Sequence, residues 1–266
     1  MFKVKYCNMR YIDKQISEEL FPNLSLFDRA IKYPYFAPDY SFSFNKGKFV
    51  KGISDDLTKR IPVLSVGSNR SPYQLKRKFS LSQNICVTPA VLIDSDIVYA
   101  ASLSAYGSIP ATQWPSKGTK AVINVLWLTE EQLNIMHLTE ALGVAYDFVK
   151  LKSGSVKINN FNYEKHIYGY VAISGVFLFE DCQPRRLSAI NATNTKLQSF
   201  SEYDALVNLK KKLGFKDKDL SNWIEMVVKD KSYRLRLHKT MKSNSVKPQN
   251  PNWEIVKTTS KGELVL

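Results

Sequence analysis

Apolar residues along the middle of the chain gather in runs whose spacing predicts strands more often than helices. A short run at Val63, Leu64 and Val66 predicts a buried strand. Five longer runs of the same kind follow at residues 87–93, 97–103, 121–128, 148–151 and 168–179. Helical spacing is found in this part of the chain at residues 72–79 and 130–140. Long strands with few helices are typical of an α+β fold with a mixed, partly closed sheet or barrel.

The residues before this strand-rich part predict an extension that packs on it. Aromatic side chains are too frequent between positions 33 and 44 for a flexible linker. Alternation of Tyr40, Phe42 and Phe44 with polar residues predicts one face of a strand. Residues 45–48 predict the turn of a hairpin, and a helix is expected to begin near Ser25.

The last third of the chain predicts helices followed by an irregular tail. Three helices are expected at residues 202–213, 221–229 and 233–241, with Ser201 as the cap of the first. After residue 243 the chain is polar and contains prolines, so we expect irregular structure with local docking at Trp253. The predicted parts are an N-terminal extension, a central barrel, a basic helical region and an irregular tail, at residues 1–61, 62–180, 181–242 and 243–266.

Composition agrees with a globular protein of the cytoplasm. The 266 residues are 44% hydrophobic, which suffices for a substantial core. The apolar runs are too short to cross a bilayer, and the N-terminus lacks the apolar core of a signal peptide. The cysteines Cys7, Cys86 and Cys182 show no paired spacing for disulfides or zinc. We therefore expect a cytoplasmic protein that contacts no membrane and needs no metal.

The formal net charge of +14 is distributed unevenly. Residues 181–266 carry seventeen lysines and arginines against nine acidic residues. Such a surplus attracts nucleic acid or another polyanion in some proteins, and in others it is a solvated face that keeps the chain soluble. Because the basic runs are short, the sequence favours the solvated face.

A tight turn at residues 67–69 joins the first predicted strand to a helix. Gly67 suits a backbone with positive φ. Ser71 and Gln74 have the spacing of a capping box, and Pro72 stands at the first helical position. Such a turn aims backbone N–H groups and the positive end of a helix dipole into one small space. That space suits a carboxylate or carbonyl oxygen.

A second segment gives this turn a specific context. Residues 106–119 form a loop and hairpin rich in Gly, Ser and Thr, and the predicted strand 121–128 and helix 130–140 follow. In this order the segments resemble the γ-glutamylcyclotransferase-like family, in particular bacterial members with N- and C-terminal extensions. The matching residues are Val66-Gly67-Ser68-Asn69, then Ser108 to Gly118, then Glu140 and Tyr146. The resemblance covers about residues 62–180, and Val66 replaces the aromatic residue that begins the family's turn.

The resemblance implies a small β-barrel with flanking helices and a lyase or acyltransferase activity without a cofactor. The substrate would be a small γ-glutamyl amide, which cyclises to 5-oxoproline and releases an amine. Glu140 would be the general acid and base, because a carboxylate at the mouth of a barrel can move the proton between the two nitrogens. The residues expected to bind substrate are Val66, Gly67, Ser68, Asn69, Tyr106, Gly107, Ser108 and Tyr146.

Each of these residues also has a simpler interpretation. Glu140 could be a surface residue at a helix end, or it could pair with a lysine, and Tyr146 could be a core aromatic. His137 is expected to be a packed helix residue, because the three histidines match no metal spacing. For the whole protein, the alternative is a non-catalytic module whose basic helices contact nucleic acid or a protein partner. A mixed pocket around Glu140 would favour the enzyme, and a continuous basic stripe over residues 196–242 would favour the binding module.

Overall fold

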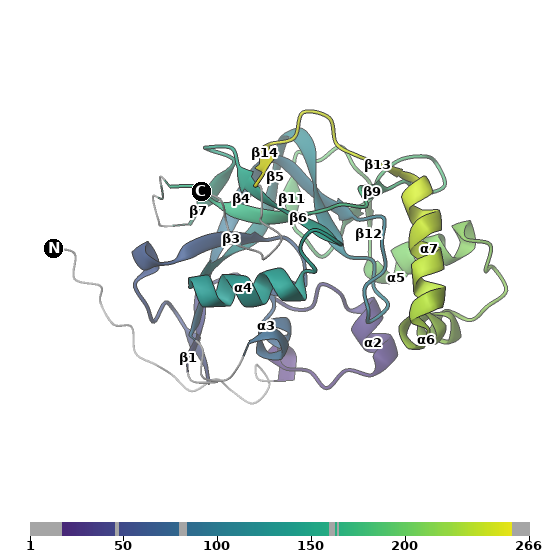
Figure 1. The fold of residues 1–266 in the computed structure, drawn as a ribbon, viewed down its shortest axis with the longest axis horizontal. Coiled ribbons are helices and arrows are strands. Elements are labelled where there is room, and N and C mark those ends of the chain that lie inside the picture. Colours follow the sequence, from purple (N-terminus) through teal and green to yellow (C-terminus); the bar gives the residue numbers. More distant parts are fainter. Residues whose placement is uncertain (1–17, 46–47, 80–83, 160–162, 164, 257–266) are drawn as a thin grey trace.

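One large mixed sheet with helices on its faces and at one end makes up the protein (Figure 1). The computed structural model describes residues 18–45, 48–79, 84–159, 163 and 165–256. The strands of the large sheet are β1 (Phe42–Asn45), β2 (Lys48–Lys51), β3 (Ile61–Ser65), β4 (Ile85–Tyr99), β5 (Ala111–Leu128), β6 (Tyr146–Leu151), β7 (Val156–Ile158), β8 (Tyr168–Ala172), β10 (Arg186–Leu187), β11 (Ala192–Thr193), β12 (Ser199–Phe200) and β14 (Trp253–Ile255). The helices are α2 (Leu26–Ile31), α3 (Pro72–Lys78), α4 (Glu130–Thr139), α5 (Glu202–Lys212), α6 (Leu220–Lys229) and α7 (Lys231–Ser243), with short 3-10 turns η1 (Leu57–Lys59) and η2 (Ser68–Arg70).

The sheet is open, so the expected α+β class is confirmed but the expected closure into a barrel is wrong. Its main path runs β12-β10-β4-β5-β3-β8-β6-β14. Short strands from the C-terminal third form both ends of this path, and those end strands do not pair with each other. A barrel needs its first and last strands to meet, and here a different segment covers each edge.

The long β4–β5 pair is the central feature of the sheet. The two strands pair antiparallel from Cys86 opposite Trp127 to Tyr99 opposite Ala111. The strands expected at residues 87–93 and 97–103 are thus a single strand that ends at Tyr99. An irregularity between Ile93 and Ser95 separates its halves. A bulge of this kind bends a strand without ending it, which explains why the sequence looked interrupted.

The N-terminal extension packs on the sheet through elements whose start signals are local. Helix α2 begins after Ser25, close to where it was expected, and Ser25 caps it by accepting a hydrogen bond from the Asp28 N–H at 3.0 Å. The predicted hairpin is also present, since β1 pairs with β2, and β1 continues the sheet beside β4. Positions 46–47 of the expected turn, like Cys7, lie outside the described residues.

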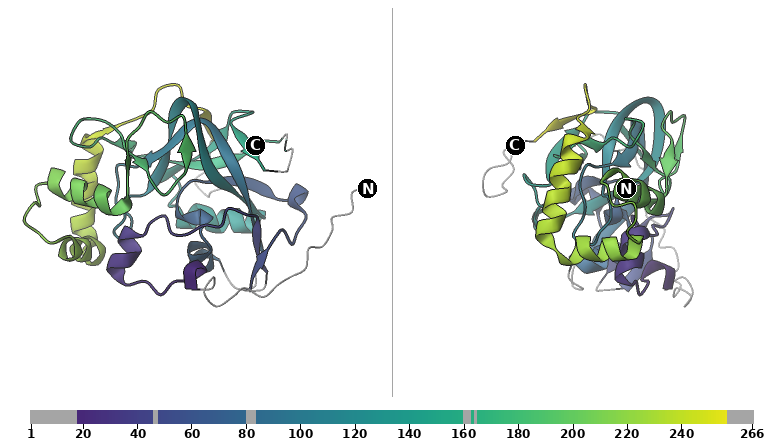
Figure 2. Two further views of the ribbon diagram at one scale, coloured as in Figure 1. Left: turned by 180° about the vertical axis from the view of Figure 1, so that it is seen from behind. Right: turned by 90° about the vertical axis from the view of Figure 1, so that its right-hand side faces the viewer.

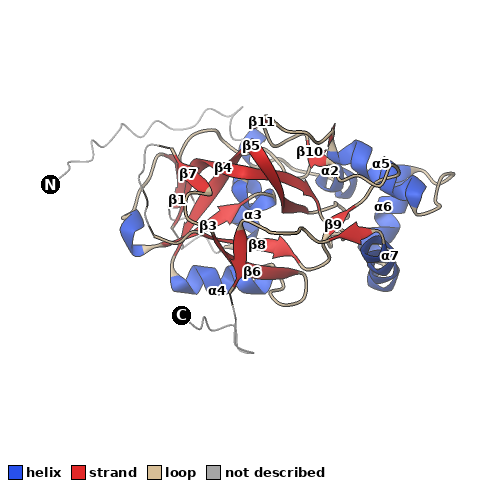
Figure 3. Cartoon of the chain, turned by 90° about the horizontal axis from the view of Figure 1, so that it is seen from above, coloured by secondary structure: helices blue, strands red, loops and turns tan. Residues whose placement is uncertain are grey.

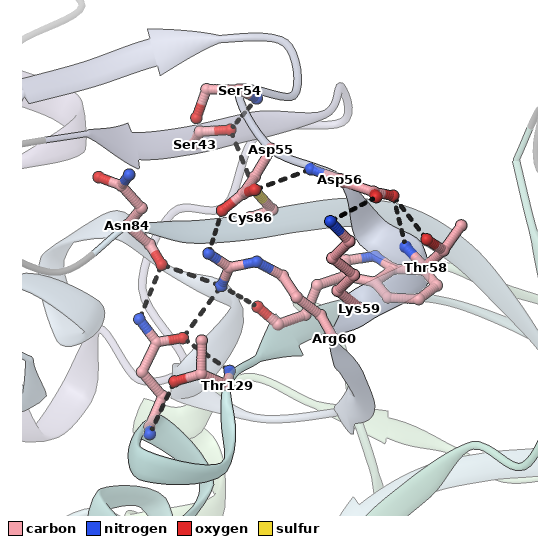
Figure 4. Close-up of polar contacts among 12 residues, drawn as sticks. Ser43, Ser54, Asp55, Asp56, Thr58, Lys59, Arg60, Asn84, Cys86 and Thr129 are labelled. Carbon is pink, nitrogen blue, oxygen red and sulfur yellow. Dashed lines mark hydrogen bonds and ion pairs between the residues drawn. The ribbon is translucent and has the colours of Figure 1, made fainter.

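Helix α4 is fastened to the sheet by a buried arginine (Figure 4). A capping box between Thr129 and Gln132 begins the helix. Arg60 donates to the side chain of Gln132 at 3.1 Å and to the carbonyls of Asn84 and Trp127, both at 3.0 Å. The guanidinium of Arg60 also pairs with Asp55. These contacts fix the start of α4 and therefore the direction in which its last turn points.

The C-terminal helices gather together at one end of the molecule (Figures 2 and 3). Ser201 caps α5 as expected, accepting from the Asp204 N–H at 3.1 Å. Trp223 of α6 is fully buried in the core cluster that also contains Trp127 of the sheet. A second cluster lies between the sheet, α3, α4 and β1. None of the described helices has the length and apolar character that crossing a membrane requires.

The segment expected to be an irregular tail contributes two short strands. β13 (Ser245–Val246) pairs with β9 (Val176–Phe177) in a small separate sheet. β14 pairs with β6, placing Trp253 opposite Leu151 with 7% of its surface exposed. The expected docking at Trp253 is therefore confirmed, whereas residues 253–255 are regular instead of irregular. The division of the chain into four parts stays a prediction.

Candidate functional site

The turn after β3 and the end of α4 meet at a hydrogen bond. Asn69 lies in η2, and Glu140 directly follows α4. The Nδ2 atom of Asn69 donates to Oε1 of Glu140 at 2.9 Å, across 71 positions of sequence. Two of the residues predicted to share a site are therefore in contact. The contact holds the carboxylate beside the turn.

A lysine also contacts Glu140, as one of the simpler interpretations of this residue predicts. Lys78, the last residue of α3, forms an ion pair with the same Oε1 atom of Glu140. Only 9% of the Lys78 side chain and 13% of the Glu140 side chain are exposed. Glu140 thus has a nearly buried cation beside it. Among the described residues, no hydrogen bond or ion pair involves its second oxygen, Oε2.

Three tyrosines lie near enough to Glu140 for its charge to raise their pKa values. Burial raises the pKa of Tyr146 well above its usual range, and the charge of Glu140 raises it further. Burial also raises the pKa of Tyr106, although hydrogen bonding to Ser68 opposes this shift and Glu140 adds to it. The pKa of Tyr170 is raised by the same two causes, burial first. At neutral pH these phenols are uncharged. The Tyr170 hydroxyl bonds to Nδ1 of His137 at 2.7 Å, so the hydroxyls of Tyr106 and Tyr146 are the ones that can donate to a substrate oxygen.

Position 67 requires a glycine because another side chain lies too close for a Cβ atom, and not because the backbone has a positive φ. Its φ is −120°, so the expected positive φ is wrong. A Cβ at this position would lie 2.3 Å from the hydroxyl oxygen of Tyr33. Tyr33 comes from the N-terminal extension, and its hydroxyl accepts a hydrogen bond from the Ala111 N–H at 2.8 Å. The glycine therefore makes room for an aromatic side chain beside the turn.

The start of α3 also differs from its prediction. Pro72 is the first helical residue, as expected. Ser71 stands at the cap position but makes no side-chain capping bond, so the expected capping box with Gln74 is wrong. The side-chain oxygens of both residues are buried without a hydrogen-bond partner among the described residues. Both residues are buried, with 1% and 7% of their surface exposed, so packing and not the helix end determines where these side chains point.

The backbone of the turn offers free donors. The N–H groups of Gly67, Ser68 and Asn69 form no hydrogen bond within the described part of the chain. These donors belong to the turn that contains Asn69, the residue that bonds to Glu140. A carbonyl oxygen could accept from them, as the turn motif predicts.

The remaining predicted residues divide into two groups. Ser108 is fully buried, bonds to Ser104 at 2.9 Å and lies within reach of Tyr106. Val66 is a core side chain. Gly107 faces α6, since a Cβ there would lie 3.0 Å from Ile224. The structure thus brings together Ser68, Asn69, Tyr106, Tyr146 and Glu140, but not Val66 and Gly107.

Sequence reasoning missed Lys78 and Tyr33. Lys78 belongs to a basic run at the end of α3, which by itself is typical of any helix C-terminus. Tyr33 was visible as part of an aromatic segment, but nothing in that segment pointed to the turn. His137, in contrast, is packed as expected, with Nδ1 2.7 Å from the Tyr170 hydroxyl. In the described residues no three His, Cys, Asp or Glu side chains are grouped to hold a metal ion.

Two cavities of about 360 Å³ and 160 Å³ lie elsewhere in the described chain. Arg70 lines the first, and Gln113 and Asp147 line the second. Neither is lined by Glu140 or by residues 67–69.

No model of a protein family matches the sequence, and no curated protein matches it either. Among solved structures, the chain is similar to a γ-glutamyl cyclotransferase, with 13% identity, coverage of 73% of this chain and 92% of that one, and a TM-score of 0.35. It is also similar to human uncharacterized protein loc79017 (14% identity, 74% and 94% coverage, TM-score 0.34). A third similar structure is At5g39720.1 from Arabidopsis thaliana (17% identity, 46% and 74% coverage, TM-score 0.34). Similarity at this level does not establish an activity for the chain.

Proposed function

We propose that this chain is a cytoplasmic γ-glutamylcyclotransferase-like enzyme that releases 5-oxoproline from a γ-glutamyl amide. The hydrogen bond from Asn69 to Glu140 is the observation that carries the proposal. It joins the turn and the carboxylate, the two parts that the reaction needs. The order of the sequence motifs in residues 62–180 supports the same activity.

The proposed reaction is an internal aminolysis. The free α-amine attacks the carbonyl carbon of its own γ-amide, a new C–N bond closes the five-membered lactam, and the old amide C–N bond breaks. Glu140 takes up each proton that the ammonium nitrogen loses and delivers it to the departing nitrogen. Because amine and carbonyl belong to one molecule, proximity supplies much of the rate.

The neighbours of Glu140 have separate roles in this proposal. Asn69 and Lys78 both hold Oε1, which leaves Oε2 to exchange protons with the substrate. The N–H groups of residues 67–69 stabilise the negative charge that develops on the carbonyl oxygen. The neutral hydroxyls of Tyr106 and Tyr146 position the substrate.

The direct test is a search for the product. The purified protein is incubated with a panel of γ-glutamyl amino acids, peptides and amines, and 5-oxoproline is measured by mass spectrometry. We expect release from at least one member of the panel and its loss in the Glu140→Gln variant. Absence of 5-oxoproline across the panel, or equal release by the variant, would refute the assignment.

One observation favours the alternative, a binding module for nucleic acid or a protein partner. Helix α7 contains no acidic residue, and its side chains Arg236, Lys239 and Lys242 are exposed. The continuous basic stripe over residues 196–242 that this alternative requires is interrupted at α5, however. Lys210 is buried and donates to the carbonyl of Phe215 at 2.7 Å, and Lys212 donates to the carbonyl of Phe179 at 2.9 Å. Lysines that stabilise carbonyls inside the fold do not extend a binding surface, so the enzyme ranks first.

A salt titration separates the two proposals. If α7 contacts nucleic acid, binding of a labelled oligonucleotide should weaken steeply as salt rises, because each phosphate contact releases counterions. The variant Arg236→Gln should bind more weakly at low salt. An oligonucleotide that fails to bind even at low salt removes the nucleic-acid alternative and does not affect the enzyme proposal.

A further inference from the structure

The 360 Å³ cavity lies beside the turn but apart from Glu140, and its lining carries a half-buried cation, Arg70. Its walls come from the N-terminal segment around Tyr35, from strands β4 and β5, and from Arg70 of η2. This volume falls in the range of about 300–1,000 Å³ that is common for small-molecule sites. No residue of the Glu140 cluster lines it.

Arg70 has little to balance its charge. Its Nη1 donates to the backbone carbonyl of Val122 at 3.2 Å. Its Nε is buried without a hydrogen-bond partner, and no carboxylate of the described residues lies within ion-pair distance of the guanidinium. Burial lowers the pKa of Arg70 to about 10, so the side chain remains charged at neutral pH. Partial burial of a cation without a carboxylate partner is costly, and a bound anion would offset that cost.

The rest of the lining can accommodate such an anion. Asn124 is 1% exposed, and its Oδ1 atom is buried without a partner among the described residues. An amide that is free of protein partners can offer either its NH₂ or its oxygen to a ligand. Lys32 adds a second cation, although Asp28 lies 3.8 Å from it, and Asp39 is the one carboxylate among the described residues of the lining.

We propose that this cavity is a binding site for a small molecule that carries an oxyanion, a carboxylate or a phosphate. The planar fork of Arg70 binds the oxyanion in a bidentate manner, as guanidinium groups commonly do. Asn124 donates a further hydrogen bond, and Val122, Ile123 and the neighbouring prolines contact the carbon skeleton. The site is separate from the proposed catalytic cluster and does not depend on its activity.

The test uses two probes that differ in the source of the oxyanion, inorganic phosphate and glutarate. Binding is measured by calorimetry and by the rise in melting temperature, with sodium chloride at equal ionic strength as the reference. At least one probe should bind the natural protein saturably. Arg70→Met should weaken that binding by about tenfold or more, the effect of losing a charge-assisted hydrogen bond. Its melting temperature without probe should equal or exceed that of the natural protein.

Three further variants make the outcome unambiguous. Arg77→Met removes an exposed arginine of the neighbouring helix α3, and Glu140→Gln alters the other cluster, so both should keep the response. Arg70→Lys keeps the charge without the fork and should bind between the natural protein and Arg70→Met. Saturable phosphate binding alone assigns a phosphate ligand, and glutarate binding alone assigns a carboxylate. The proposal is overturned if neither probe binds, or if Arg70→Met binds as well as the natural protein.

Discussion

At the scale of single residues, Glu140 and Lys78 decide how the candidate site behaves. A nearly buried ion pair costs desolvation energy, and each partner depends on the other once both are inside. Glu140 therefore carries two separable properties, proton transfer through Oε2 and charge pairing through Oε1. Substitutions can test these properties one at a time.

Replacing Glu140 by Gln should reduce 5-oxoproline release by about 10²–10⁴-fold, the usual cost of a lost general acid or base. Stability should also fall, by roughly 3 kcal/mol, because Lys78 keeps its charge and loses its partner. If Glu140 had only apolar neighbours, the same substitution would cause no loss of stability. Activity and denaturant unfolding are measured on the same preparation.

The double variant with Lys78→Met is the matched control. It removes both charges, so it should regain most of the lost stability while staying inactive. A stable double variant with full activity would show that the pair is structural and that Glu140 transfers no proton.

Gly67 and Tyr33 should behave as a coupled pair. Gly67→Ala should destabilise by about 1–3 kcal/mol, because the new Cβ meets the Tyr33 hydroxyl. Tyr33→Phe removes that oxygen, so the same alanine should cost less in this background. A double-mutant cycle from denaturant unfolding measures the difference. If alanine costs the same in both backgrounds, Tyr33 is not the reason for the glycine.

Glu202 should make stability depend on pH. Its carboxyl is buried, accepts from the Ile109 N–H at 2.6 Å through Oε1, and has no described partner at Oε2. Burial raises the pKa of Glu202 well above its usual range. The folded state thus favours the protonated form, so its contribution is complete below the unfolded pKa and declines as pH rises toward the folded pKa. The decline is up to about 1.4 kcal/mol per pH unit.

Glu202→Gln removes this titration. The stability of the variant relative to the natural protein should therefore increase between about pH 5 and about pH 7. Thermal unfolding of both proteins across this range checks the sign. A constant difference would mean that Glu202 is charged in the folded protein.

At the scale of elements, the last described strand, β14, contributes more to stability than its polar surroundings in the sequence indicate. β14 covers the edge of β6, and Trp253 is largely buried there. Trp253→Ala should lower stability by about 3–5 kcal/mol, as for other buried tryptophans. Ile255 of the same strand is 63% exposed, so Ile255→Ala should change little. Equal melting temperatures for both variants would show that the edge contributes nothing to stability.

At the scale of the whole molecule, the N-terminal extension and the C-terminal third both complete the central sheet. β1 lies beside β4, β10 and β11 pair with β4 and β5, and β14 pairs with β6. The segment that carries the motifs thus has neighbours from both ends of the chain. In this arrangement the sheet is open, and the short strands β12 and β14 form the two ends of its main path.

The sequence by itself determined the features that depend on neighbouring residues. The caps Ser25 and Ser201, the proline that begins α3 and the β1–β2 hairpin follow from contacts a few positions apart. Apolar runs likewise located most strands, because the alternation of side chains along a strand is a local property. The approach of the turn to Glu140 was predicted through the family resemblance, and not from spacing.

The tertiary structure alone decided which charges and rings meet. Lys78 lies 62 positions from Glu140, and the Tyr33 hydroxyl is 78 positions from the amide that it accepts from. No period or cap along the chain encodes such a pairing, because it depends on how α3, α4 and the extension pack on the sheet. The same holds for Arg70. Its position beside β5 and the N-terminal segment, without a carboxylate partner among the described residues, depends on how these segments pack together.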